Sequence, residues 1–238
     1  MINTIDESQR KAATIAGFTG LFTMAIAIFA YYGLASRLVV AGNAAETFRN
    51  IAANETLFRV VIACNLAYGA GVVVFLTALY VILRPVNPGV ALLGALFRLV
   101  YALMFIVSAV NSLAVLRLSS GADYLRVFET DRLQALATLY RGANFDAYYV
   151  GLPFYGLASM VCAYLWFKSS YIPGALAGFG VIASAWCAVS AFAFLISPEF
   201  GRAVNLYSLD SPMGAFEMAT GLWLLFKGLR PPRNAESR

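Results

Sequence analysis

Six long apolar stretches, separated by short polar segments, make up most of the 238-residue chain. A transmembrane helix needs about 20 mostly apolar residues. The stretches that approach or exceed this length lie at residues 12–35, 58–83, 90–116, 146–167, 175–197 and 212–227. The last is the shortest, and Ser211 with Pro212 provides an N-cap and a first helical position for it. The pattern predicts an all-α fold, a polytopic membrane bundle of six transmembrane helices in one integral membrane domain, residues 1–238.

The second, fourth and sixth stretches end in the same way. In each, an aromatic residue is followed four positions later by a cation: Tyr80 and Arg84, Tyr164 and Lys168, Trp223 and Lys227. Such pairs are typical of a membrane–water boundary on the cytoplasmic side. The side that carries them has a net charge of +5 and all three lysines, whereas the opposite side is neutral. Lys and Arg taken together are equally numerous on both sides, so the short loops and the shared endings decide the orientation. We expect both termini in the cytoplasm.

Two longer loops fall on the predicted outer side. Asn43 and Glu46 have the spacing of a capping box at the start of a short helix. Thr130 can cap a second one, in which Leu133, Leu136 and Tyr140 share a face. We expect two short amphipathic helices that lie on the membrane surface or over the mouth of the bundle.

Composition narrows the chemistry. Only 12% of the residues are charged and 61% are hydrophobic, whereas soluble domains have about 25% charged residues. The chain has no histidine, which excludes His-ligated haem and metal sites and catalytic bases of the Ser-His or Cys-His type. Cys64, Cys162 and Cys187 lie in separate stretches without a CxxC pair, so we expect no disulfide framework, no metal and no cofactor. The basic pI of about 9.2 does not imply nucleic acid, and the expected partner is the lipid bilayer.

Arg98 and Glu217 are charged residues inside predicted transmembrane helices. A charge at the centre of a bilayer costs about 2.5–3.5 kcal/mol, so such residues usually face the protein interior and find a partner. Counted from the predicted cytoplasmic boundary, Arg98 lies about 12 Å deep and Glu217 about 15 Å deep. The two side chains are therefore expected to meet.

Other polar residues extend this pair into a candidate pocket. Arg98 heads a stripe on its helix that continues through Tyr101 toward Asn111, while Asn65 and Tyr68 share a face of the second helix. The predicted ligand-binding residues are Arg98, Glu217, Tyr101, Asn65, Tyr68 and Asn111. A buried ion pair that only fixes helix register explains the two charges equally well, and polar residues also join helices by hydrogen bonds.

Several segments point to a known family. They are SRLVVAGNAAET, ANETLFR, LRPVNPGVALLGALFRLV and FEMATGLWLLFKG, in this order along the chain. With them the chain resembles, over about residues 12–228, a bacterial family of integral membrane proteins known only as a domain of unknown function (number four-three-eight-six). The resemblance implies a helical multi-pass fold, and a bacterial cytoplasmic (inner) membrane is the expected location. It brings no activity, cofactor or catalytic residue.

Three functions remain open at this point. The first is binding or translocation of a small amphipathic or lipid-like ligand in the polar pocket. The second is an intramembrane enzyme that uses Glu217 as a general acid on a lipophilic substrate. The third is an accessory subunit, because small-residue faces such as Gly180-x3-Ser184-x3-Ala188 and Ala63-x3-Ala67-x3-Gly71 suit close packing, either within the chain or in a homo- or hetero-oligomer.

Overall fold

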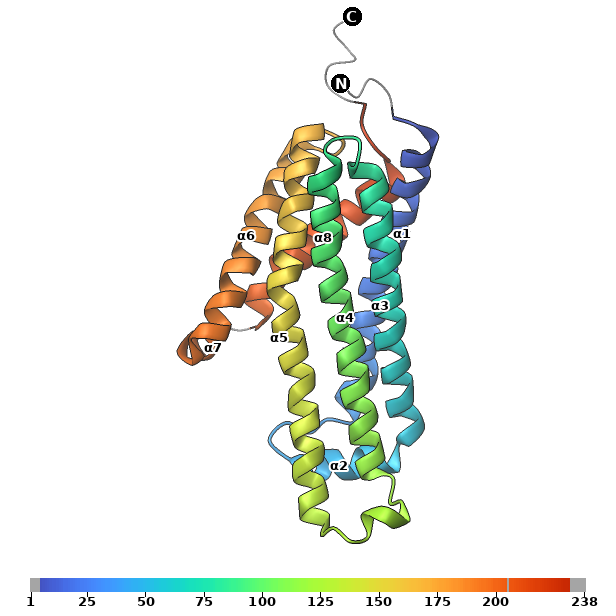
Figure 1. The fold of residues 1–238 in the computed structure, drawn as a ribbon, viewed down its shortest axis with the longest axis vertical. Coiled ribbons are helices and arrows are strands. Elements are labelled where there is room, and N and C mark those ends of the chain that lie inside the picture. Colours follow the sequence, from blue (N-terminus) through green and yellow to red (C-terminus); the bar gives the residue numbers. More distant parts are fainter. Residues whose placement is uncertain (1–4, 205, 232–238) are drawn as a thin grey trace, which may run out of the picture. The chain divides into compact units, whose positions relative to one another are not determined.

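Helices make up all the regular structure in the part of the chain that the computed structural model describes, residues 5–204 and 206–231 (Figure 1). This confirms the predicted all-α fold class. The α-helices are α1 (Glu7–Ile28), α2 (Ala44–Ala53), α3 (Glu55–Leu83), α4 (Pro88–Ser119), α5 (Thr130–Ser169), α6 (Gly174–Ile196), α7 (Pro198–Ala203) and α8 (Leu206–Phe226). A π-helical segment (Phe29–Leu34) and a 3-10 turn (Ala35–Arg37) continue α1, and a 3-10 turn (Asp123–Leu125) precedes α5.

Five helices in the described residues are long and apolar enough to cross a membrane. They are α1 with its continuation to Arg37, and α3, α4, α5 and α6. These helices fit a multi-pass membrane protein. The predicted count of six spans is not confirmed, because α8 is helical but is not among the five. This helix carries Asp210 and Glu217 within 21 residues.

The predicted start of the last helix is wrong. Helix α8 begins at Leu206, and Pro212 lies inside it instead of in its first turn. Leu209 and Met213 are both fully buried and stand four residues apart, so the buried face of the helix continues across the proline. Burial of Leu209 thus extends the helix toward the N-terminus, past Ser211 and Pro212, where the sequence predicted its start.

The two outer loops behave differently. Helix α2 begins after Asn43, whose Oδ1 accepts a hydrogen bond from the Glu46 backbone N–H at 2.9 Å, which confirms the first capping prediction. Thr130 does start a helix, but α5 continues to Ser169 without a break. The prediction of a separate surface helix there is wrong, because the residues between Tyr140 and Asp146 include no proline, and their one glycine, Gly142, costs only about 1 kcal/mol.

The chain forms two compact units. Helices α1, α3, α4 and α5 are each divided between them, with one part in the first unit and the other part in the second. The first unit comprises Met1–Thr23, Ala70–Ala102 and Tyr149–Arg238, and the second comprises Met24–Gly69 and Leu103–Tyr148. In the first unit α6 packs against α8 (Figure 1). The ring of Phe216 fills the space beside Gly180, and Ser184 Oγ lies 3.4 Å from Met213 Sδ. The Gly180–Ser184–Ala188 face is therefore a packing surface within the chain, whereas Ala63 and Ala67 are exposed.

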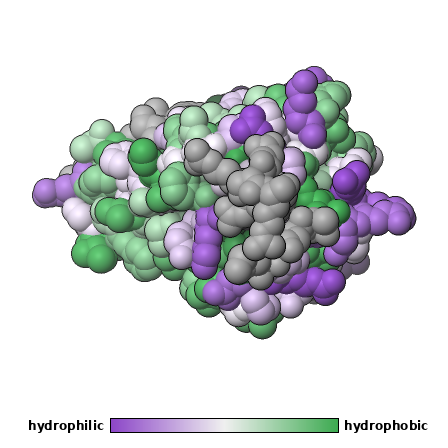
Figure 2. All heavy atoms as spheres, turned by 90° about the horizontal axis from the view of Figure 1, so that it is seen from above, coloured by the Kyte–Doolittle hydropathy of each residue, from purple (hydrophilic) through white to green (hydrophobic). Residues whose placement is uncertain are grey.

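Three helix endings come together at one end of the first unit. Gln9 Nε2, near the start of α1, donates hydrogen bonds to Ile82 O at 3.0 Å and to Tyr171 Oη at 3.1 Å. The Arg230 backbone N–H, beyond α8, donates to Tyr171 O at 2.8 Å. The ends of α3, α5 and α8 thus lie on the same side, as their shared sequence pattern predicts. In the view from above, hydrophilic residues form groups around the edge, with hydrophobic residues between them (Figure 2).

The second unit has an apolar core that contains Leu38, Ile51, Phe58, Ile62 and Val115. Two hydrogen bonds join its buried polar groups. Thr47 Oγ1 accepts a hydrogen bond from the Val40 backbone N–H at 2.9 Å, and Asn144 Nδ2 donates to Ser112 Oγ at 3.1 Å. Helix α2 is thereby tied to the segment that precedes it.

Candidate functional site

Arg98 of α4 and Glu217 of α8 form an ion pair in the first unit, as the sequence predicts. One guanidinium nitrogen, Nη2, donates a hydrogen bond to Glu217 Oε1. Arg98 lies about 15 Å from the start of α4, and Glu217 lies about 14 Å from the end of α8. The Arg98 side chain is 7% exposed and the Glu217 side chain 25% exposed. Arg98 is therefore buried in the helical bundle of this unit, and Glu217 is partly buried.

Two aromatic rings flank the Arg98 guanidinium. Its central carbon lies 5.2 Å from the ring centre of Phe75 on α3 and 4.8 Å from that of Tyr155 on α5. A cation above a ring face is attracted by the quadrupole of the ring, and the interaction strengthens to about 2 kcal/mol where water is excluded. These rings replace part of the hydration that the guanidinium loses. Arg98 is thus held in place by contacts from three other helices.

A small cavity adjoins the pair. Its volume is about 20 Å³, and its lining includes Arg98, Glu217, Ser159, Cys162, Trp166 and Thr220. A water molecule needs roughly 10–15 Å³ measured in this way. The cavity therefore has room for about one water molecule and not for a larger ligand.

Two hydroxyl groups in the lining have no hydrogen-bond partner among the described residues. They are Ser159 Oγ on α5 and Thr220 Oγ1 on α8, and both oxygens are buried. More than 90% of buried backbone polar groups, and most buried side-chain polar atoms, are hydrogen-bonded. Each of these hydroxyls can donate to a guest and accept from one. The cavity therefore combines one ion pair with two unsatisfied hydroxyls.

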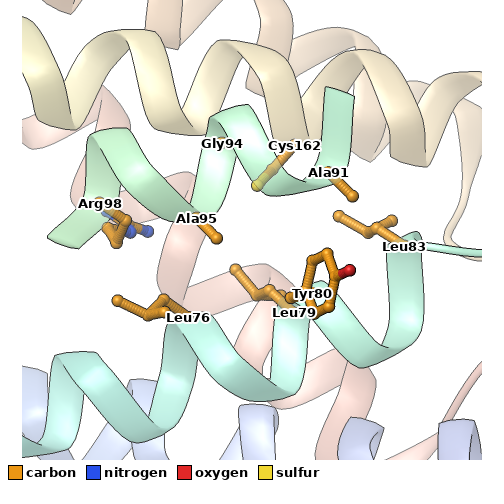
Figure 3. Close-up of a pocket in the computed structure, with 9 residues that line it drawn as sticks. All are labelled: Leu76, Leu79, Tyr80, Leu83, Ala91, Gly94, Ala95, Arg98 and Cys162. Carbon is orange, nitrogen blue, oxygen red and sulfur yellow. The ribbon is translucent and has the colours of Figure 1, made fainter. Parts of the chain in front are cut away.

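A second space lies on the other side of Arg98, between α3 and α4 (Figure 3). Leu76, Leu79 and Leu83 line one wall, Ala91, Gly94 and Ala95 line the other, and Cys162 reaches in from α5. The space has a volume of about 10 Å³. Small residues on α4 leave this shallow apolar groove, and Arg98 stands at one end of it (Figure 3).

A family described as "Domain of unknown function (DUF4386)" matches residues 15–228. The chain belongs to this family. The resemblance noted from the sequence segments is confirmed, and it covers both Arg98 and Glu217. Comparison with curated proteins gave no match, and comparison with solved structures gave none either. The family description and the apolar helices together fit a membrane protein of unknown activity.

The structure places the predicted site residues of this DUF4386 chain in different surroundings. Arg98 and Glu217 line the cavity. Tyr101 is buried, and its ring lies tilted against that of Tyr155 with 4.8 Å between the ring centres, so it contacts a neighbour of Arg98. Asn65, Tyr68 and Asn111 belong to the second unit, where the tilted rings of Tyr68 and Phe105 have their centres 4.2 Å apart. Their role in ligand binding stays a prediction.

Sequence reasoning missed several residues of the site. Thr220 is not one of them, because it follows Glu217 by three positions, and this spacing places both residues on one helical face and predicts Thr220 beside the pair. Phe75, Tyr155 and Ser159 gave no such signal, because aromatic residues and single serines are common in apolar helices. Within residues 5–204 and 206–231, no group of three or more Cys, Asp or Glu side chains is arranged to hold a metal ion. The site therefore offers charge, hydroxyl groups and an apolar groove.

Proposed function

We propose that this protein binds a small anionic amphiphile at Arg98. The observation that carries the proposal is the cavity in which an arginine is accompanied by two buried hydroxyls without partners. An arginine and two hydroxyls are all hydrogen-bond donors. Donors that converge on one small space suit a carboxylate, sulfonate or phosphate-like head group.

The apolar groove explains why the ligand is amphipathic. It starts at Arg98 and is lined mainly by leucine, alanine and glycine (Figure 3). Its lining offers an apolar contact to an alkyl chain that lies along it, and a ligand with an alkyl chain also reaches the site from the lipid. An ionisable residue within a membrane is by default a candidate for a functional site. The two hydroxyls, which have no partner among the described residues, can donate to the head group of a ligand.

The enzyme alternative has less support. A general acid that acts on a lipophilic substrate needs a second group to complete the proton transfer. Among the described residues that line the cavity, Glu217 is the sole carboxylate. We therefore assign Glu217 to ligand binding, in the role developed below.

The proposed location is a bacterial cytoplasmic membrane with both termini on the cytoplasmic side. Exposed cations follow the helix endings that gather at one end of the first unit: Arg84, Lys168, Lys227 and Arg230. Cytoplasmic loops carry an excess of Lys and Arg in membrane proteins. The small-residue face at Ala63 and Ala67 remains a proposed contact for an oligomer or a partner subunit.

The proposal predicts binding of decanesulfonate, whose head group stays anionic at all working pH values. The measurement is isothermal titration calorimetry on the protein in phosphatidylcholine nanodiscs, with empty nanodiscs subtracted. The wild type should bind decanesulfonate and not decyltrimethylammonium. The Arg98→Gln/Glu217→Gln double variant removes both charges together, and it should lose at least tenfold in affinity, as expected for loss of a charge-assisted contact of about 1.5–3 kcal/mol.

The groove is tested separately. Ala95→Leu fills it with a larger side chain and should weaken decanesulfonate binding, whereas Ala70→Leu, an exposed position on α3, should not. Methanesulfonate, which has no alkyl chain, distinguishes an amphiphile site from a site for small anions. The proposed function is wrong if the double variant binds decanesulfonate as tightly as the wild type does.

A further inference from the structure

The space beside Arg98 limits how an anion can bind. The cavity has a volume of about 20 Å³, which is room for about one water molecule. The aromatic rings of Phe75 and Tyr155 stand against the guanidinium. The position that a carboxylate or sulfonate needs, in direct contact with Arg98, is the one that Glu217 fills. An anionic head group therefore has to replace the Glu217 carboxylate.

Charge balance leads to the same requirement. Arg98 and Glu217 together are neutral. An additional anion next to them would leave one uncompensated negative charge in a buried site, and an unpaired buried charge costs several kcal/mol. A proton on Glu217 restores neutrality, since it leaves Arg98 paired with the ligand.

Thr220 supplies a place for the displaced side chain. It follows Glu217 by three residues on α8, so the two side chains are neighbours on the helix surface. Thr220 Oγ1 is buried and has no partner among the described residues. A protonated Glu217 carries an O–H group that can donate to this oxygen. The structure thus provides a hydrogen-bond acceptor that the ion pair does not use.

From these observations we propose that Arg98 binds its ligand by anion exchange, with uptake of one proton by Glu217. This inference rests on the proposed function and adds the number of protons taken up per ligand bound. The ligand anion forms the ion pair with Arg98, the Glu217 carboxylate leaves it, and one proton from solvent binds to the released carboxylate. Glu217 is thereby a built-in competitor for the site, and proton availability sets how easily it is displaced.

The other titratable groups around Glu217 do not interfere near neutral pH. Arg98 faces it from α4, and Tyr155 and Cys162 face the pair from α5. Cys187 on α6 is the nearest such group from that helix, and Asp210 precedes Glu217 on α8 itself. From α1 and α3 the neighbours are Gly17, against Gly221, and Phe75. Free thiols and phenols titrate at about 8.5 and about 10, and arginine stays charged. Asp210 is the other carboxyl group of α8, so it is the group to control.

The test counts protons during binding. Decanesulfonate is titrated into wild-type protein in phosphatidylcholine nanodiscs at pH 7, in phosphate and in Tris buffer, which release different heats when they lose a proton. The dependence of the observed heat on the buffer gives the number of protons taken up. We expect one proton to be taken up per decanesulfonate bound, and an affinity for decanesulfonate that falls as the pH rises, because a step that takes up a proton is favoured at low pH.

Variants assign the proton to a residue. Glu217→Gln should take up none, should bind decanesulfonate more tightly than the wild type, and should show no pH dependence. Asp210→Asn should behave like the wild type. The wild-type heats test the proton uptake itself even if Glu217→Gln fails to fold, and Asp210→Asn then tests whether Asp210 is its source. Clear binding with no proton uptake overturns the exchange and leaves the proposed function intact, whereas no binding at all overturns both.

Discussion

Two buried polar clusters of the first unit use similar groups in different ways. At the end of the unit, Gln9 is 2% exposed, its Nε2 donates to Ile82 O and Tyr171 Oη, and its Oε1 accepts from the Asp6 backbone N–H at 3.2 Å. Around Arg98, one ion pair is made, and the Ser159 and Thr220 hydroxyls have no partner among the described residues. The first cluster is saturated with hydrogen bonds and the second is not.

We interpret this as the difference between a structural cluster and the proposed binding site. A buried network whose hydrogen bonds are all made holds helices together. An unsatisfied buried donor or acceptor instead costs about 1–3 kcal/mol of stability, because it loses its hydration and gains no hydrogen bond. A folded protein retains an unsatisfied buried group of this kind when the group has another role, such as binding. The Gln9 cluster joins the start of α1 to the ends of neighbouring helices, and nothing in it is left to bind a guest. The Arg98 cluster has two hydroxyl groups, those of Ser159 and Thr220, that line a cavity and make no hydrogen bond to the described residues.

The largest expected effect comes from breaking the ion pair on one side. Glu217→Ala leaves Arg98 buried without a counter-ion, and removal of one partner of a buried pair costs about 3–5 kcal/mol. The measurement is the free energy of unfolding in detergent micelles, followed by circular dichroism. Arg98→Gln/Glu217→Gln removes both charges, and it should be far less destabilised than Glu217→Ala.

The matched control for this prediction is Glu55→Ala. Glu55 forms an ion pair with Arg59 at 2.7 Å, in which both side chains are about half exposed. Exposed pairs contribute about 0.2–1 kcal/mol, so Glu55→Ala should change stability little. Equal losses for Glu55→Ala and Glu217→Ala would show that burial of the Arg98 pair has no energetic consequence.

The second prediction tests the saturated cluster. Gln9→Leu removes the donor to Ile82 O and Tyr171 Oη and leaves these groups buried, which should cost about 1–3 kcal/mol. Decanesulfonate affinity, measured in nanodiscs, should not change. Thr14→Ala, an exposed position on the same helix, is the control and should be close to neutral. A Gln9→Leu protein that unfolds normally but no longer binds decanesulfonate would remove the distinction between the two clusters.

Only some features of the two clusters could be predicted from the sequence. The apolar stretches identified the helices, and the position of Arg98 and Glu217 in those stretches identified the pair, because charges in an apolar environment need partners. The break expected before Pro212 was wrong, since burial of Leu209 and Met213 outweighs one lost backbone hydrogen bond. Tertiary packing of this kind has no local signature.

The surroundings of the pair were harder to foresee for the same reason. Which rings stack on Arg98, and which hydroxyls stay unpaired, depends on the angle at which α3, α5 and α8 approach α4. Ser159 and Ser190 are both buried serines whose hydroxyls have no hydrogen-bond partner in the described part of the chain, and the lining of the cavity includes Ser159. Periodicity along one helix assigns a residue to a face, but it does not give the residue on the next helix that it meets. Gln9 was missed likewise, because a single amide near a helix start looks like a surface residue.

The smallest expected effect on stability comes from the unpaired hydroxyls. Thr220→Val replaces a hydroxyl with a methyl group of similar shape, and because that hydroxyl has no partner, its removal should change the free energy of unfolding by no more than about 1 kcal/mol, toward greater stability. Thr77→Val on α3 is the control, since that hydroxyl is exposed and donates to Val73 O at 2.8 Å. Decanesulfonate affinity of Thr220→Val should fall about threefold to tenfold, whereas Thr77→Val should retain it. A loss of stability as large as that of Gln9→Leu would mean that the Thr220 hydroxyl has a structural partner after all, and the Arg98 cluster would then belong with the saturated one.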